Sequence, residues 1–224
     1  MRILFVFATK NEAGILLNFT EKGTLSEQFS FGGHEIDTLI TGVGGISTAW
    51  SMKLWLSMNP APDLAINAGI AGSYNDDIRT GDVVLTVTDC FADLGIGSED
   101  KIMTLFEAGL SDPDQFPFSG GVIHCQNRFI GKVGAAIKKV NAATVNTCSG
   151  SVSAISRIRN KFNPDIETME GATFFYICAR EKIPFLSVRS VSNKVEPGNR
   201  ESWNIPLALD SLAEKIKEIL LILN

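Results

Sequence analysis

A strand–helix–strand pattern between Asp165 and Trp203 constrains the fold more than any other stretch of this 224-residue chain. It opens with Asp-Ile-Glu-Thr-Met-Glu-Gly, continues as an apolar segment to Arg180, and then reads Ile-Pro-Phe-Leu-Ser-Val-Arg-Ser-Val-Ser-Asn. Glu170 stands where the first strand turns into the helix, and Asn193 ends the second strand. Ligands bind beyond the carboxyl ends of the strands in open α/β sheets. We expect the two strands to be adjacent, so that this carboxylate and this amide face one crevice.

Strands and helices alternate along the rest of the chain. The continuous apolar run Ile3–Ala8 is typical of a strand that is covered on both faces. Further strands are predicted at Glu35–Thr41, Leu64–Asn67, Asp82–Thr88 and Ala142–Cys148. The clearest helix is C-terminal, where apolar residues repeat at spacings of four and three: Ile205, Leu209, Leu212, Ile216, Ile219 and Leu223. This alternation predicts a single α/β domain over residues 1–224, with a largely parallel sheet.

Composition and charge exclude several classes of protein. The formal net charge of −5 leaves no basic surplus for broad nucleic-acid binding. The four cysteines are 35, 23 and 30 residues apart and form no CxxC pair or Cys/His cluster, so we expect neither a metal site nor a disulfide framework. We find no secretory leader and no apolar stretch of membrane-spanning length. These features predict a cytoplasmic protein that binds no nucleic acid, membrane, metal or cofactor.

The segment from Cys90 to Gly121 is predicted as a long loop, because glycines and prolines recur along it. A loop of this length inside a compact domain is either functional or a contact between subunits. The sequence leaves both interpretations open.

Glu12 has two interpretations. Thr9-x-x-Glu12 matches a capping box, in which the glutamate side chain binds the backbone amide of the capping residue. A carboxylate that follows the first strand can also activate water in a cleft as a general base. Glu170 and Asn193 also have two interpretations each. Besides a role at a site, Glu170 could be an ordinary helix start, and Asn193 could simply cap the end of a strand.

Two glycine-rich segments are candidates for contacts with a ligand. Gly42-Val-Gly-Gly-Ile-Ser47 is similar to a dinucleotide fingerprint, but Ser47 replaces the third glycine and the segment does not follow the first strand. We therefore expect a tight turn into a helix rather than an NAD site. Gly69-Ile-Ala-Gly72 can present backbone N–H groups to a ligand, or it can be a structural turn.

Six motifs occur together in the order of a known superfamily. They are Ala8-Thr-x-x-Glu12, Thr41-Gly-Val-Gly44, Asn67-Ala-Gly-Ile-Ala-Gly72, Gly81-Asp-Val-Val84, Met169-Glu-Gly171 and Arg189-Ser-Val-Ser-Asn193. Together they resemble the purine nucleoside phosphorylase/nucleosidase superfamily. The resemblance implies a three-layer α/β/α fold with a central mixed, largely parallel sheet, a purine nucleoside substrate and a homo-oligomer. Thr168–Gly171, with Ser192–Pro197 and Trp203, is most similar to the futalosine hydrolases, which release hypoxanthine from futalosine on a route to menaquinone.

The resemblance also assigns roles around the sugar. Met169 and Glu170 would contact the ribose, with the carboxylate holding the sugar hydroxyls. Glu12 would position and deprotonate the attacking water. Ala71 and Gly72 would lie near the sugar.

Around the base, the resemblance places Thr147 and Cys148 along the purine, although this chain lacks the aromatic residue that methylthioadenosine nucleosidases usually carry there. The adenine-directed enzymes have aspartate at the position of Asn193, and aspartate can accept from a 6-amino group. An asparagine amide instead donates toward N7 and a 6-oxo group, which favours hypoxanthine. Arg200 and Lys194 are candidates for binding the benzoate end of futalosine.

Charge favours hydrolysis over phosphorolysis. A phosphorylase holds a multiply charged anion and generally uses arginines. Here Glu12 follows the first strand, and no arginine flanks Gly69–Gly72 before Arg79. The predicted reaction is therefore hydrolysis of the N-ribosidic bond of futalosine, with Glu12 and Asn193 as catalytic residues. A methylthioadenosine/adenosylhomocysteine nucleosidase, a purine nucleoside phosphorylase and a catalytically idle nucleoside-binding protein remain alternatives.

Overall fold

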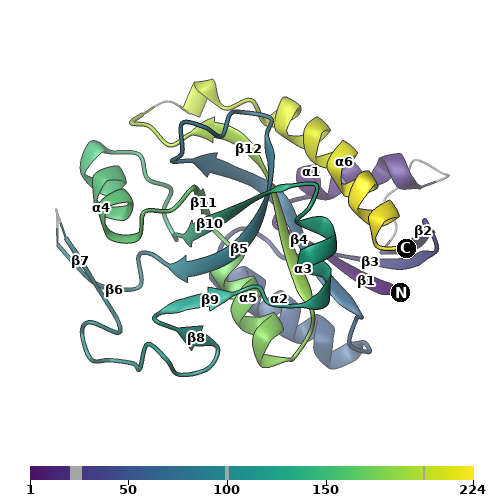
Figure 1. Cartoon of the computed structure of the whole chain (residues 1–224), viewed down its shortest axis with the longest axis horizontal. Coiled ribbons are helices and arrows are strands. Elements are labelled where there is room, and N and C mark those ends of the chain that lie inside the picture. Colours follow the sequence, from purple (N-terminus) through teal and green to yellow (C-terminus); the bar gives the residue numbers. More distant parts are fainter. Residues whose placement is uncertain (21–26, 99–100, 199) are drawn as a thin grey trace.

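The computed structural model describes residues 1–20, 27–98, 101–198 and 200–224, in which strands and helices alternate (Figure 1). The strands are β1 (Arg2–Phe7), β2 (Gln28–Phe31), β3 (His34–Ile40), β4 (Leu64–Ser73), β5 (Val83–Phe91), β6 (Gly95–Gly97), β7 (Ile102–Thr104), β8 (Phe118–Ser119), β9 (Val122–His124), β10 (Lys138–Thr144), β11 (Ile166–Thr168) and β12 (Phe185–Lys194). The helices are α1 (Lys10–Ala13), α2 (Gly45–Met58), α3 (Arg128–Val133), α4 (Val152–Phe162), α5 (Gly171–Arg180) and α6 (Ile205–Ile222), with short 3-10 helices at Gly14–Phe19 and Arg200–Ser202.

Ten strands of the described chain form one mixed sheet, in the order β2-β3-β1-β4-β11-β10-β5-β9-β8, and β12 pairs with both β4 and β5. Strands β3, β1, β4 and β12 form one parallel block, and β5, β10 and β11 form another. Antiparallel pairing of β12 with β5 and of β11 with β4 joins the two blocks. The expected α/β fold with a mixed sheet is therefore confirmed.

Five of these strands close a ring, because β4 pairs with β12, β12 with β5, β5 with β10, β10 with β11, and β11 with β4. One apolar cluster takes side chains from all five strands. Since β4 lies between β11 and β12, the expectation that the strands carrying Glu170 and Asn193 are adjacent is wrong. Gly72 of β4 nevertheless pairs with Glu167 of β11 and with Asn193 of β12, so both strand ends reach the same place.

Helices cover both faces of the sheet, with α6 on one side and α2 and α5 on the other (Figure 1). Along β1, Ile3, Phe5 and Phe7 belong to the core under α6, whereas Leu4 and Val6 belong to the core under α2 and α5. A strand that is buried on both faces needs apolar residues at every position, which explains the continuous run near the N-terminus. Among the helices that the structure describes, none is long and apolar enough to cross a membrane.

Two strand boundaries differ from the prediction. β4 continues to Ser73, so Gly69–Gly72 is strand rather than turn, because its backbone pairs with β12. β10 ends at Thr144, so Thr147 and Cys148 lie in the link to α4. The described part of the predicted loop also contains the β6–β7 hairpin and β8.

Candidate active site

A cavity of about 700 Å³ opens at the carboxyl ends of β1, β4, β11 and β12. Seven of the eight residues expected at the site line it: Glu12, Ala71, Gly72, Cys148, Met169, Glu170 and Asn193. Thr147 is exposed and does not line the cavity. The residues that sequence patterns assigned to water, sugar and base are therefore brought together, with this one exception.

Glu12 combines the two geometries that the sequence left open. Its Oε2 accepts hydrogen bonds from the Thr9 backbone N–H at 2.9 Å and the Thr9 hydroxyl at 2.8 Å, and its own N–H donates to the Thr9 Oγ1, which completes the capping box. Its Oε1 accepts from the Ile70 N–H at 3.1 Å, on the wall of the cavity. The cap thus fixes one oxygen and leaves the other facing the site.

Glu170 is buried between the first turn of α5 and the turn that precedes α2. Its Oε1 accepts from the Gly44 N–H at 2.9 Å, which uses the glycine turn as an anchor for the carboxylate. Burial raises the pKa of Glu170 above its usual value, whereas the positive charge of Arg189 and the Gly44 amide lower it, and the negative charge of Glu12 raises it further. The two carboxylates are therefore close enough to influence each other.

Arg189 was not among the predicted site residues. It is fully buried in β12 and donates to the Asn67 Oδ1. A Cβ atom on Gly69 would lie 2.5 Å from the Glu12 Oε1 and 2.6 Å from the Arg189 Nη1, so both groups approach through the space that the glycine leaves open. The sequence signals for it were its place at the start of the Arg189–Asn193 motif and its charge in the middle of a strand.

Asp89 is a second buried charge that the sequence patterns did not single out. Its Oδ1 accepts from the Thr144 hydroxyl and the Cys90 N–H, and the Thr144 Oγ1 in turn accepts from the Ala172 N–H at the start of α5. The Oδ2 has no partner among the described residues and lies 2.1 Å from where a Gly171 Cβ would be. Burial raises the pKa of Asp89 to about 7.

The amide of Asn193 is held by its neighbours in the chain. The Ser192 hydroxyl donates to its Oδ1 at 2.8 Å, and its Nδ2 donates to the Lys194 carbonyl at 3.0 Å. An amide nitrogen carries two hydrogens, so the second one remains for a ligand. Gly72 makes room for this group and for Val195, because a Cβ there would lie 2.8 Å from the Val195 Cγ2 and 3.3 Å from the Asn193 Nδ2.

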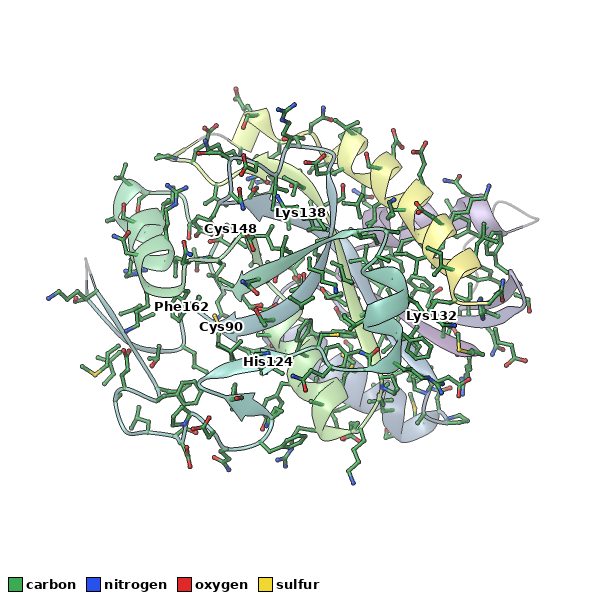
Figure 2. The ribbon with its side chains drawn as sticks, viewed as in Figure 1. Cys90, His124, Lys132, Lys138, Cys148 and Phe162 are labelled. Carbon is green, nitrogen blue, oxygen red and sulfur yellow. The ribbon has the colours of Figure 1, made fainter. Side chains whose placement is uncertain are left out.

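One wall of the cavity carries sulfur and carboxylate groups, from Cys148, Met169 and Glu167. The Cys148 thiol lies 3.5 Å from the Met169 Sδ, in the link between β10 and α4 where Figure 2 labels it. Glu167, which the sequence patterns also missed, accepts hydrogen bonds from Tyr74 and Ser149 at the same wall. All four of the cysteines are free, and only Cys148 is exposed.

The two cations expected at the far end of a substrate are placed differently. Arg200 is exposed and lines the cavity together with Trp203. Lys194 pairs with Asp76 and does not line the cavity. Within the described ranges, no group of His, Cys, Asp and Glu side chains is arranged to hold a metal ion.

Comparison with known families agrees with this arrangement. The model of the phosphorylase superfamily matches residues 3–223. Among curated proteins, a 5'-methylthioadenosine/S-adenosylhomocysteine nucleosidase of Glaesserella parasuis is 26% identical and covers 99% of this chain and 97% of its own. A futalosine hydrolase of Streptomyces coelicolor is 27% identical and covers 82% of this chain and 77% of its own.

Solved structures share the fold. A nucleosidase of the first kind from S. pneumoniae, bound to the transition-state inhibitor MT-ImmA, has a TM-score of 0.83 and covers 100% of both chains at 18% identity. The futalosine hydrolase of Helicobacter pylori has a TM-score of 0.78 and covers 98% of this chain and 97% of its own at 17% identity. Both kinds of nucleosidase therefore resemble this chain in sequence and in fold.

Proposed function

The chain belongs to the phosphorylase superfamily, and we propose that within it the chain hydrolyses the N-ribosidic bond of futalosine. The curated proteins that it resembles are nucleosidases, which supports N-glycosyl hydrolase chemistry. The products are hypoxanthine and dehypoxanthine futalosine, so the reaction belongs to menaquinone biosynthesis. In this proposal the enzyme is a cytoplasmic homo-oligomer that needs no cofactor.

The placement of Glu12 carries the proposal. One carboxylate oxygen is fixed in the capping box, while the other faces the cavity at the Ile70 N–H. A water molecule that is hydrogen-bonded to this Oε1 can lose a proton to it as it attacks the anomeric carbon. The C–O bond to water then forms as the C–N bond to the base breaks, and the base leaves with the bonding electrons.

Glu170 supports the sugar as positive charge develops on it. Its carboxylate is anchored by the Gly44 N–H through one oxygen, so the other can accept from the ribose hydroxyls. An oxocarbenium-like state is stabilised by carboxylates fixed in a site that excludes water. Glu170 is buried, as this role requires.

The charges of the site favour water over phosphate as the nucleophile. Three buried carboxylates, Glu12, Glu167 and Glu170, line the cavity, and Arg200 is the single arginine among its described lining residues. Arg189 does not line the cavity. Its guanidinium donates a hydrogen bond to Asn67, and its positive charge acts on the buried carboxylate of Glu170. A multiply charged anion would meet net negative charge here.

Asn193 supports hypoxanthine as the leaving base. The Ser192 hydroxyl donates to its Oδ1 and holds the amide in this orientation, and its second N–H can donate to N7 or to a 6-oxo group. A 6-amino group opposite this N–H would place donor against donor, at a cost of about 1–3 kcal/mol. An amide cannot transfer a proton as a carboxylic acid can, so the proton on the departing base comes from water.

A methylthioadenosine/adenosylhomocysteine nucleosidase is the second candidate. The observation that favours it is the extent of the match, since the curated relative of that kind covers 99% of this chain. The two candidates differ in the base that they release, adenine in one case and hypoxanthine in the other.

The test is an assay of released bases by chromatography, with futalosine, inosine and methylthioadenosine as substrates, each with and without phosphate. We expect hypoxanthine from futalosine at a rate that phosphate does not change. Faster release of adenine from methylthioadenosine would establish the second candidate. A requirement for phosphate would establish a phosphorylase, and binding without any release over hours would leave a nucleoside-binding protein.

A further inference from the structure

Glu167 is a buried carboxylate in the cavity wall, and its only part in the proposed function is to add negative charge to the site. Its Oε2 accepts from the Tyr74 hydroxyl at 2.6 Å and from the Ser149 hydroxyl at 2.6 Å. Its Oε1 accepts from the Ser149 backbone N–H at 2.9 Å. One carboxylate thus joins three segments: β11, the residue that follows β4, and the link between β10 and α4.

That link carries Cys148 to the cavity. Glu167 holds the link at Ser149, and Met169 contacts it at the Cys148 thiol, 3.5 Å from the Met169 sulfur. Tyr74 is itself held from α4, because the Arg159 guanidinium lies 5.7 Å from the centre of the tyrosine ring and donates to the Tyr74 carbonyl. The wall is therefore braced from two sides.

The charge of Glu167 also acts on this wall. The donors from Tyr74 and Ser149 compensate the buried carboxylate of Glu167 for its lost hydration. Although Cys148 is exposed as a residue, its thiol is partly removed from water, which raises its pKa, and the negative charges of Glu167 and Glu170 raise it further. The reactivity of this thiol therefore reports on both the position and the charge of Glu167.

We propose that Glu167 is a positioning residue, which acts through Tyr74 and Ser149 to hold the Cys148 link as the wall on which the purine base binds. The identity of the ligand as a purine rests on the proposed function, whereas the bracing of the wall does not. Loss of Glu167 should weaken binding of the base and raise KM more than it lowers kcat, because Glu12 and Glu170 stay in place.

The first experiment measures alkylation of Cys148 by iodoacetamide, followed by mass spectrometry of its peptide. Cys90, Cys125 and Cys178 are buried and react only if the fold opens, so they separate a local change from global unfolding. In Glu167→Gln, Cys148 should react at least about tenfold faster, because a charge is removed and the link is released. In Tyr74→Phe the charge remains, so the increase should be smaller.

The second experiment measures the dissociation constant of free hypoxanthine by calorimetry and its protection of Cys148. In the unmodified protein, hypoxanthine should slow alkylation. In Glu167→Gln its dissociation constant should rise about tenfold, as loss of a charge-assisted brace implies. The dissociation constant of adenine is measured in parallel, so that the role of Glu167 is tested even if the protein binds adenine rather than hypoxanthine.

Glu107→Gln is the matched control, because Glu107 also joins segments as a carboxylate. It accepts from the Thr104 N–H and pairs with Lys161 of α4, away from the cavity. This variant should leave Cys148 alkylation and base binding unchanged. The proposal is overturned if Glu167→Gln alkylates like the unmodified protein, or if neither base protects Cys148. If the protein does not hydrolyse futalosine but the alkylation pattern is as expected, only the proposed substrate is wrong and the role of Glu167 stands.

Discussion

The carboxylate of Glu12 and the guanidinium of Arg189 converge on the space that a side chain at position 69 would occupy. The Glu12 Oε1 lies 2.5 Å and the Arg189 Nη1 2.6 Å from the position of a Cβ on Gly69. Glu12 lines the cavity and Arg189 does not, so the two groups reach this point from different sides of β4. The absence of a side chain at one position thus sets the geometry of the candidate base.

Gly69→Ala should lower kcat/KM by at least about a hundredfold, because a methyl group there must displace both groups, and a shift of one ångström in a catalytic group costs that much. Gly14→Ala is the control: Gly14 has a helical conformation, and a Cβ there meets nothing within 4 Å. Steady-state rates of base release should fall only for the first variant. Equal rates for both would mean that the approach of Glu12 and Arg189 has no part in turnover.

Glu12→Gln should reduce kcat by about a thousandfold, which is the usual contribution of a general base, and leave the melting temperature nearly unchanged. Glutamine is compatible with a capping box, so the helix start is preserved. Thr9→Ala gives the complementary result: it removes the capping hydroxyl, costs about 1 kcal/mol of stability and keeps most of the activity. Calorimetric melting together with initial rates separates the two roles, and near-normal turnover in Glu12→Gln would reduce this residue to a cap.

Asn193→Asp should shift the preference toward 6-aminopurine nucleosides by about tenfold to a hundredfold, because a carboxyl group can accept from the amino group. The measurement is the ratio of kcat/KM for adenine and hypoxanthine release. Ser192→Ala removes the hydroxyl that holds the Oδ1 without adding charge, so it should blunt discrimination without reversing it. An unchanged ratio in Asn193→Asp would show that the base is selected elsewhere.

The acid limb of the pH profile should report on Glu170. Its anion is the form that accepts from ribose, so kcat/KM should rise with pH as it ionises, and burial places that limb above the usual glutamate pKa. Arg189 lowers the pKa of Glu170, so Arg189→Met should move the limb to higher pH, while Arg189→Lys, which keeps the charge, should move it less. Coincident profiles in variants that melt normally would contradict this assignment.

Asp89 should make the protein lose stability as the pH rises. Its folded-state pKa is about 7 against 3.8 for the free group, so its contribution is fully present below about pH 4 and is lost as the pH rises toward 7. The loss is on the order of a few kcal/mol. Denaturant unfolding of Asp89→Asn at acidic and neutral pH should show a smaller difference between the two than the unmodified protein does. An equal difference would mean that Asp89 ionises normally.

The residues found from sequence were those that stand at strand ends. Glu12 follows β1, Glu170 follows β11 and Asn193 lies at the end of β12, and the carboxyl edge of a sheet brings such residues together. The sequence patterns missed three charged residues that lie within strands: Arg189, Asp89 and Glu167. The role of a charged residue in a strand can be assigned only when its contacts are known. Asn67, the partner of Arg189, is 122 positions away in the chain.

The strand that begins at Leu64 was predicted too short for a related reason. Glycine disfavours strands, so a structural turn at Gly69–Gly72 was one of the two interpretations, but pairing with β12 holds the segment extended. The absence of side chains there serves Glu12, Arg189 and Asn193, whose side chains occupy the space. The strand propensity of these residues could not predict the extended conformation, because it depends on β12 and on side chains that are distant in the sequence.

The closed ring of five strands has a consequence for how the molecule is made. Its last member is β12, which ends at Lys194 and supplies two of the five pairings. During translation, β4 and β5 cannot pair with β12 until it has been synthesised, more than one hundred residues later. Contacts of such long range form slowly. Nascent chains that stop short of β12 lack Ser192, Asn193 and the other lining residues from there onward, so binding should appear only near the end of translation.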